Sequence, residues 1–199
     1  MEFIPLVFLK KRKIFLKREG EPSSLKEIIE KKGDLTELYF FDIDGIEKDK
    51  PNLCTYQQIQ NQVFWVDSGP RDIGDIVDLL LAGAQKLIIR QTLWNGKDLS
   101  PIREVTENEI YSFLDLSQSN TLQQELVFSS SIDGYILFSK KRDLKQDFKL
   151  GSQLKQSLKN FKLIVFDEDP QNITYWKSVG AQGILVELGR IKEFTRYGF

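Results

Sequence analysis

The sequence predicts one compact (βα)8 barrel, an α/β fold, over residues 1–199. Short runs rich in β-branched and aromatic residues alternate with segments of helical periodicity along the chain. Several of these runs are apolar throughout, which is typical of parallel strands buried on both faces. The alternation fits either a barrel or an open doubly wound sheet. A strand–turn–helix–strand unit recurs half a chain apart and favours the barrel, since two fused half-barrels would show it.

Eight strands are expected, most of them followed by a helix. The strands cover residues 3–9, 38–43, 63–66, 87–89, 110–114, 134–138, 163–166 and 184–186. Ser23 or Ser24 caps the first helix, and Gly33 ends it. The clearest helix stops at Gly83. Its expected apolar face consists of Ile73, Ile76, Val77, Leu80 and Leu81. Further helices are expected within residues 154–161 and 173–179.

The repeat relates residues 63–73 (VFWVDSGPRDI) to residues 163–173 (LIVFDEDPQNI). Asp67 and Asp167 occupy equivalent positions, and each is followed by a proline and an isoleucine at the same spacing. Each segment continues through a helix to the tripeptide Gly-Ala-Gln, at residues 83–85 and 180–182, and then into an apolar strand. We interpret the repeat as a half-barrel duplication.

Charge and composition exclude several classes of partner. Twenty-eight basic and 29 acidic residues leave a net charge of −1, which lacks the positive field of a nucleic-acid-binding protein. No apolar run approaches the roughly 18 residues that a membrane span requires. Cys54 is the only cysteine, so we expect no intrachain disulfide and a cytoplasmic location. We expect Cys54 to be a small packing residue.

The chain contains no histidine. Ser-His-Asp and Cys-His catalysis are therefore excluded, as is every zinc site that needs imidazole. Acid–base chemistry at neutral pH is left to carboxylates, lysine, tyrosine or Cys54.

Three segments are similar to those of a known family. Residues 41–46 (FDIDGI), followed by residues 50–52 (KPN), resemble the second-strand signature of the HisA/HisF family of histidine-biosynthesis barrels. Residues 67–71 (DSGPR) resemble the glycine-rich loop after that family's third strand, and residues 3–5 (FIP) resemble its start. The resemblance implies a shortened relative of ProFAR isomerase, similar to isomerase-related archaeal proteins without an assigned activity.

The same resemblance marks departures. The family's first catalytic aspartate matches Phe8, and its second matches Asp115. Of its two phosphate-binding loops, the first keeps Gly69, whereas Asp167-Glu168-Asp169 replaces the second. Glu187 stands where the family has a glycine-led turn. These changes imply that the chain is not an authentic histidine-pathway isomerase.

Barrel active sites form at the carboxyl ends of the strands, where this sequence predicts an acidic mouth. The candidate ligand-binding residues are Asp67, Ser68, Gly69, Arg71, Arg90, Asp167, Glu168, Asp169 and Glu187; the candidate catalytic residues are Asp115, Asp42 and Asp44. Such carboxylates fit a divalent cation, a cationic or amine-bearing substrate, or polar strand ends and helix caps without catalysis. They oppose a doubly phosphorylated ligand, because like charges repel.

The leading hypothesis is a small-metabolite enzyme that performs an isomerase- or lyase-type proton transfer. Asp115 would transfer the proton, and Asp42 or Asp44 would orient the substrate or act as a second acid–base group. We expect no organic cofactor, leave a divalent metal open, and expect a monomer or homodimer. The alternative is a non-catalytic barrel that acts as a binding or assembly partner. The basic clusters at residues 10–13 and 140–142 fit either solvated loops or support for a single phosphate.

Overall fold

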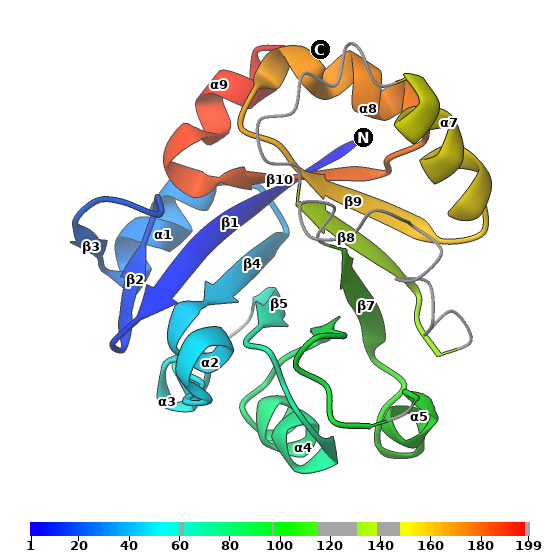
Figure 1. The fold of residues 1–199 in the computed structure, drawn as a ribbon. Coiled ribbons are helices and arrows are strands. Elements are labelled where there is room, and N and C mark those ends of the chain that lie inside the picture. Colours follow the sequence, from blue (N-terminus) through cyan, green and yellow to red (C-terminus); the bar gives the residue numbers. More distant parts are fainter. Residues whose placement is uncertain (60–61, 97, 115–130, 139–147, 198–199) are drawn as a thin grey trace.

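Eight parallel strands close into a barrel in the computed structural model, which confirms the expected fold (Figure 1). The structure describes residues 1–59, 62–96, 98–114, 131–138 and 148–197. The barrel strands are β1 (Glu2–Lys10), β4 (Glu37–Asp42), β5 (Val63–Asp67), β6 (Lys86–Arg90), β7 (Glu109–Leu114), β8 (Gly134–Phe138), β9 (Lys162–Phe166) and β10 (Gly183–Glu187). Parallel pairing of β10 with β1 completes the ring. Each predicted strand corresponds to one of these.

Helices lie outside the ring of strands (Figure 1). They are α1 (Leu25–Lys32), α2 (Ile43–Lys48), α3 (Leu53–Tyr56), α4 (Ile73–Leu81), α5 (Ser100–Val105), α7 (Phe148–Ser157), α8 (Ile173–Val179) and α9 (Ile191–Thr195), with short 3-10 turns η2 (Pro170–Asn172) and η3 (Leu188–Arg190). Ser24 caps α1 by accepting the Glu27 N–H, as expected. The predicted face of α4 is partly wrong, because the helix buries Ile76 and Leu79 and leaves Leu81 76% exposed.

An antiparallel hairpin extends β1 beyond the barrel. After β1 the chain turns at Lys11 and Arg12 into β2 (Lys13–Phe15), which pairs with β3 (Pro22–Ser23). Of the basic cluster at residues 10–13, Lys11 and Arg12 form this tight turn, and Lys10 and Lys13 pair with each other across it. The apolar residue Ile14 stabilises this arrangement, because it is buried in the core between strands and helices.

Side chains alternate between the barrel lumen and the layer of helices, as the pleat of a strand requires. The lumen holds a cluster of its own: Ile4, Leu6, Phe8, Tyr39, Trp65, Ile88, Tyr111, Ile136, Ile164 and Leu185. A larger cluster fills the space between strands and helices. This alternation decides which strand-end residues reach the mouth.

The sequence repeat corresponds to a repeated interaction. Gln85 accepts the Phe64 N–H through its side-chain oxygen (2.9 Å) and donates its own N–H to the Phe64 carbonyl (3.2 Å). Gln182 makes the same two bonds with Leu163, at 2.6 and 2.9 Å. The structural equivalent of Phe64 is therefore Leu163, one residue out of step with the sequence alignment. As a result, Asp67 follows the lumen side of its strand, whereas Asp167 follows the helix side.

Four charged side chains close the amino-terminal end of the barrel. Lys86 Nζ lies 2.8 Å from Glu37 Oε1 and 3.1 Å from Glu109 Oε2, and Lys162 also contacts Glu109. Each is the first residue of its strand and lies two positions before a lumen residue, so all four face the lumen. Trp65 donates its ring N–H to Glu37 and carries Lys86 over its face. The network pairs charges where the lumen opens to solvent.

We expect Lys86→Met to lower the free energy of unfolding at neutral pH by about 1–3 kcal/mol, because it leaves two partly buried carboxylates with one partner fewer. Burial raises the pKa of Glu109, but hydrogen bonds from Lys162 and Lys86 outweigh this and hold the pKa below its ordinary value of 4.5. A carboxyl group with a lowered folded-state pKa stabilises the protein above its unfolded pKa and loses that contribution as pH falls. Wild-type stability should therefore fall on acidification below about pH 4.5, and less steeply in the variant.

Urea unfolding from neutral to acidic pH measures both effects. Lys26→Met is the matched control, because Lys26 is 86% exposed and pairs only with Glu30 on the surface of α1 among the described residues. Equal stability losses in the two variants would contradict a structural role for the network.

Candidate functional site

The lumen-facing residue at the end of each strand defines the barrel mouth. Counting in steps of two from the lumen cluster gives Phe8, Phe41, Asp67, Arg90, Phe113, Phe138, Phe166 and Glu187. Five of these eight positions hold phenylalanine. The mouth is therefore an aromatic layer interrupted by three charged residues, Asp67, Arg90 and Glu187.

Phe138 lies at the centre of the aromatic layer. Its ring centroid is 4.7 Å from that of Phe166, 5.0 Å from that of Phe113 and 5.7 Å from that of Phe41. Phe8 extends the layer through a contact with Phe41 at 5.7 Å. Tilted and offset rings at these distances attract one another beyond the burial of their area. The layer is thus a continuous apolar floor.

A buried ion pair fixes the polar side of this floor. Arg90 donates to both oxygens of Asp67, at 2.8 and 2.6 Å, and Tyr39 donates its hydroxyl to the same carboxylate at 2.9 Å. Asp67 is 0% exposed. Burial and the nearby carboxylate raise the pKa of Tyr39 well above its ordinary range, so the phenol stays a donor. The guanidinium lies 3.6 Å from the centre of the Phe113 ring, a cation–π contact.

A pocket of about 440 Å³ opens above the floor. Its lining consists of the five mouth phenylalanines, Arg90, and the charged residues Lys17, Arg18, Glu19, Glu168 and Glu187. The first three charged residues come from the segment between β2 and β3, so the hairpin extension forms one wall. Glu187 lies at the end of β10 and is held against this wall, because its Oε1 accepts the Arg18 N–H at 3.3 Å. The volume is in the range of small-molecule sites.

Two of the expected mouth carboxylates lie on the outer face of the barrel wall. Asp42 is fully buried, with its oxygens accepting from Gly45 N, Tyr56 Oη and both nitrogens of Asn52 at 2.7–3.1 Å. Burial raises the pKa of Asp42, and these four donors oppose the rise. Asp167 accepts from the Trp176 ring nitrogen at 2.7 Å. Among the described residues the predicted ring of carboxylates is therefore wrong in its geometry.

The other candidate carboxylates lie in several different places. Glu168 and Glu187 line the mouth pocket, whereas Asp44 lines a different pocket and pairs with Lys48 at 2.7 Å. Asp169 is exposed and caps η2 through the Gln171 N–H. Asp115 lies outside the described residues, so its predicted role stays a prediction. Within the described ranges, no group of three or more Cys, Asp or Glu side chains is arranged to hold a metal ion.

The loop after β5 has a packing role. Ser68 is buried against Gly45, and Gly69 adopts a φ of +66°, a conformation that glycine tolerates best. Arg71 donates to the carbonyls of Gly69 and Gly45, at 2.9 and 3.3 Å, and pairs with Asp49 at 2.6 Å. These contacts join the loop to α2. These packing contacts account for the residues that resembled a glycine-rich phosphate loop, and the account requires no bound phosphate.

Sequence reasoning missed the aromatic layer, although a signal was present. Phenylalanine is the last lumen-side residue of β4, β7, β8 and β9, and in β1 it is the last one before the strand leaves the barrel after Leu9. The apolar run of each strand indicates which alternate residues face the lumen. The exact strand ends were needed to know which of these residues came last.

Comparisons with known proteins show the fold. No protein-family model and no curated protein sequence matches the chain. The crystal structure of a 3-hexulose-6-phosphate synthase is similar, with a TM-score of 0.65 and 11% identity over 99% of both chains. The 3-hexulose-6-phosphate synthase from Salmonella typhimurium has a TM-score of 0.63 and 12% identity, over 99% of this chain and 98% of that chain. Both support a TIM barrel.

The expected membership of the HisA/HisF family is wrong by these findings. The two similar structures named above are 3-hexulose-6-phosphate synthases, and no family model supports a link to histidine biosynthesis or to the archaeal proteins. The motif at residues 41–46 has a local physical cause instead, since Asp42 caps α2 and Gly45 packs against Ser68.

Across the described part of the chain, no helix is long and apolar enough to span a bilayer.

Gly45→Ala should be destabilising by about 1–3 kcal/mol, because a Cβ there would lie 2.5 Å from the Ser68 carbonyl oxygen and force backbone to move. Gly20→Ala is the matched control, since no atom lies within 4 Å of its added Cβ. Thermal unfolding of both variants tests the packing of α2 on the β5 loop. A Gly45→Ala protein as stable as the control would show that this approach is not close in solution.

Proposed function

We propose that this chain is a small-metabolite enzyme whose substrate binds at the barrel mouth with a flat, apolar part against the phenylalanine floor. The observation that carries the proposal is the pocket itself: five phenyl rings from five strands below a rim of charged side chains. Ligand sites combine an apolar lining with a few polar groups in this way. The fold is that of structures named as enzymes, which supports catalysis but supplies no substrate.

The charges of the pocket favour a ligand without two phosphate groups. Asp67 already neutralises Arg90, so this cation adds little net field at the floor. The rim carries two basic and three acidic residues, a net charge of −1. An uncharged or cationic polar group pointing toward the rim fits this balance, whereas a doubly phosphorylated sugar would meet net repulsion.

Proton transfer at this site would use the rim carboxylates. Glu187 ends β10 on the lumen side and Glu168 follows β9, so both side chains border the space above the rings. Carboxylates at this position can act as general acid or base, because they lie within reach of a ligand bound against the rings. Asp115, which follows β7 directly in the sequence, remains a second candidate. Asp42 is less suited, because four donors already occupy its oxygens.

The aromatic floor also favours the alternative of a non-catalytic binding barrel. Phenylalanine can neither donate nor accept a proton, and it occupies five of the eight strand-end positions from which barrel enzymes draw catalytic groups. Binding and catalysis must therefore be measured separately.

Binding is tested by a thermal-shift screen of small aromatic and alicyclic metabolites, followed by calorimetry with each hit. We expect Phe166→Leu to weaken binding by about three- to tenfold, because it keeps an apolar side chain but removes the ring face. Phe161→Leu is the matched control, since this ring packs against Tyr135 in the outer cluster. The absence of any hit, or equal weakening in both variants, would contradict a ligand site at the mouth.

Catalysis is tested by incubating a bound ligand in D2O and following its C–H signals by NMR. An isomerase- or lyase-type enzyme should exchange a ligand hydrogen for deuterium even when no net product forms. We expect Glu187→Gln to slow this exchange by about 100-fold or more while affinity changes only a few-fold. The same assay on Asp115→Asn decides between the two carboxylates. Tight binding without exchange in the wild type would establish the non-catalytic alternative.

A further inference from the structure

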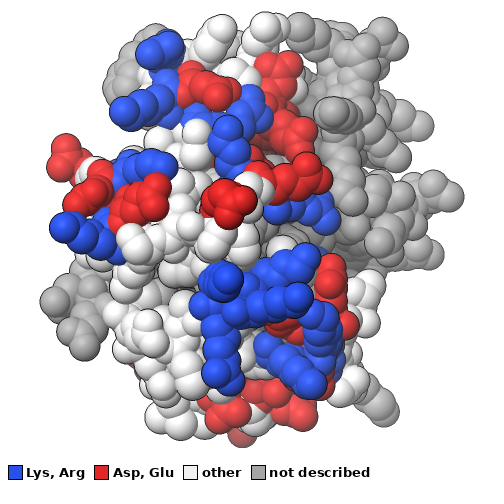
Figure 2. Space-filling model, turned by 90° about the vertical axis from the view of Figure 1, so that its left-hand side faces the viewer, with Lys and Arg blue, Asp and Glu red and all other residues white. Residues whose placement is uncertain are grey.

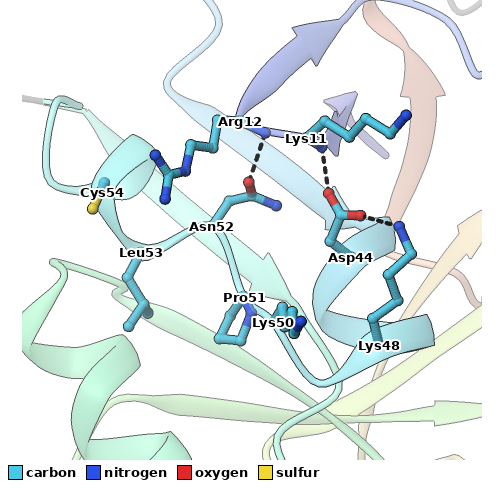
Figure 3. A pocket seen from close by; sticks show the side chains of 9 residues that line it. All are labelled: Lys11, Arg12, Asp44, Lys48, Lys50, Pro51, Asn52, Leu53 and Cys54. Carbon is cyan, nitrogen blue, oxygen red and sulfur yellow. Dashed lines mark hydrogen bonds and ion pairs between the residues drawn. The ribbon is translucent and has the colours of Figure 1, made fainter.

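A second pocket lies at the tip of the hairpin and shares no lining residue with the mouth pocket. Its volume is about 520 Å³. It is lined by Lys11, Arg12, Asp44, Lys48, Lys50, Pro51, Asn52, Leu53 and Cys54, from the β1–β2 turn, α2 and the start of α3 (Figure 3). Figure 2 shows the same side of the molecule, where Lys and Arg side chains gather densely at the height of the hairpin and α2.

The pocket carries a large excess of positive charge. Four of its lining residues are basic and one is acidic. Lys48 pairs with that residue, Asp44, at 2.7 Å. Among the described residues, no ion pair involves the side chains of Lys11, Arg12 or Lys50. Three cations are therefore left without a carboxylate partner there, on a chain whose net charge is −1.

Two of these cations occupy positions that disfavour them. Lys11 and Arg12 have φ angles of +52° and +61°, in the left-handed region. A two-residue hairpin turn with both φ angles positive strongly prefers Asn-Gly, and other side chains there cost about 1 kcal/mol or more each. Strained residues in an ordered turn point to a functional constraint. Both residues line one pocket, and Figure 3 shows the Arg12 side chain extending toward Cys54 while the Lys11 side chain extends the opposite way.

The turn is held in place by the opposite wall of the pocket. The Arg12 N–H donates to Asn52 Oδ1 at 2.9 Å, and the Lys11 N–H donates to Asp44. Asn52 is itself buried and bonded to Asp42, so the wall is rigid. Because the backbone amides of the turn are already used, only side chains remain to meet a ligand. Figure 3 shows the Arg12 guanidinium extending over α3 on the side of Cys54, while Lys48 reaches up from α2 to Asp44.

We propose that this pocket binds the phosphate group of a small phosphorylated molecule, at a site separate from the barrel mouth. Arg12 offers a planar fork of donors that matches phosphate, and Lys11 and Lys50 add point charges. The volume is suited to a metabolite rather than to a bare ion alone, and Pro51 and Leu53 give its remaining part an apolar contact. The site does not depend on the function proposed for the mouth.

The test combines Lys11→Asn with Arg12→Gly. This double variant has the turn sequence that the backbone prefers, so its melting temperature should equal or exceed that of the wild type. It removes both cations, so binding of inorganic pyrophosphate, measured by calorimetry at constant ionic strength, should weaken about tenfold or more. The matched control is Lys26→Gln with Lys159→Gln, which changes the net charge equally at exposed positions and should bind as the wild type does.

Cys54 provides an independent readout at the same pocket. It is the only cysteine of the chain and is exposed, contrary to the packing role expected from the sequence. Pyrophosphate should slow its alkylation by iodoacetamide, an uncharged reagent, in the wild type and in the control but not in the double variant.

Saturable one-to-one binding that only the double variant loses, together with protection of Cys54, supports the site. Absence of saturable pyrophosphate and orthophosphate binding in the wild type overturns it. Equal weakening in the control also overturns it, because the effect would then be general electrostatics. Binding only to an RNA oligonucleotide or to anionic phospholipid vesicles would replace the small molecule with a macromolecular partner and would equally overturn the proposal.

Discussion

A carboxylate without access to water must have its charge balanced inside the protein. Asp67 is in this position at the end of β5, and Arg90 on the neighbouring strand supplies the balance through two hydrogen bonds. The fork geometry fixes the plane of the guanidinium, which in turn lies on the Phe113 ring. Phe113 contacts Phe138, the centre of the aromatic layer. The floor of the mouth pocket is thus aligned by one buried ion pair.

Much of the fold could be predicted because its determinants are local. Strands that are buried on both faces appear as apolar runs, and Ser24 and Gly33 mark the ends of α1 through caps that involve only neighbouring residues. The hairpin after β1 could not be predicted in this way. Its turn holds Lys11 and Arg12 rather than glycine or asparagine, and the turn is bonded to Asp44 and Asn52, which lie 33 and 40 positions away in the sequence.

The candidate site was harder to predict than the fold. The sequence places Asp42, Asp67, Asp167 and Glu187 at strand ends, but it does not say which side of the barrel wall each one faces. One residue of difference in a strand end separates a lumen-facing carboxylate from a helix cap. Asp42 caps α2 and Asp167 accepts the Trp176 ring N–H on the helix side, so only Asp67 and Glu187 face the lumen. Residue type alone therefore indicated an acidic mouth, whereas the alternation of side chains along each strand places an aromatic layer there.

The one-residue offset within the repeat has a consequence for how such barrels diverge. Gln85 and Gln182 tie their helices to the preceding strands in the same way, while the aspartates of the two segments face opposite sides of the wall. Asp67 follows the bonded residue Phe64 by three positions and Asp167 follows Leu163 by four, and this one residue exchanges a lumen side chain for one under the helices. The fold tolerates this difference because the two hydrogen bonds between glutamine and strand are the same in both segments. Two half-barrels can then keep similar sequences at residues 63–73 and 163–173 while the matching aspartates lie on opposite faces of the sheet.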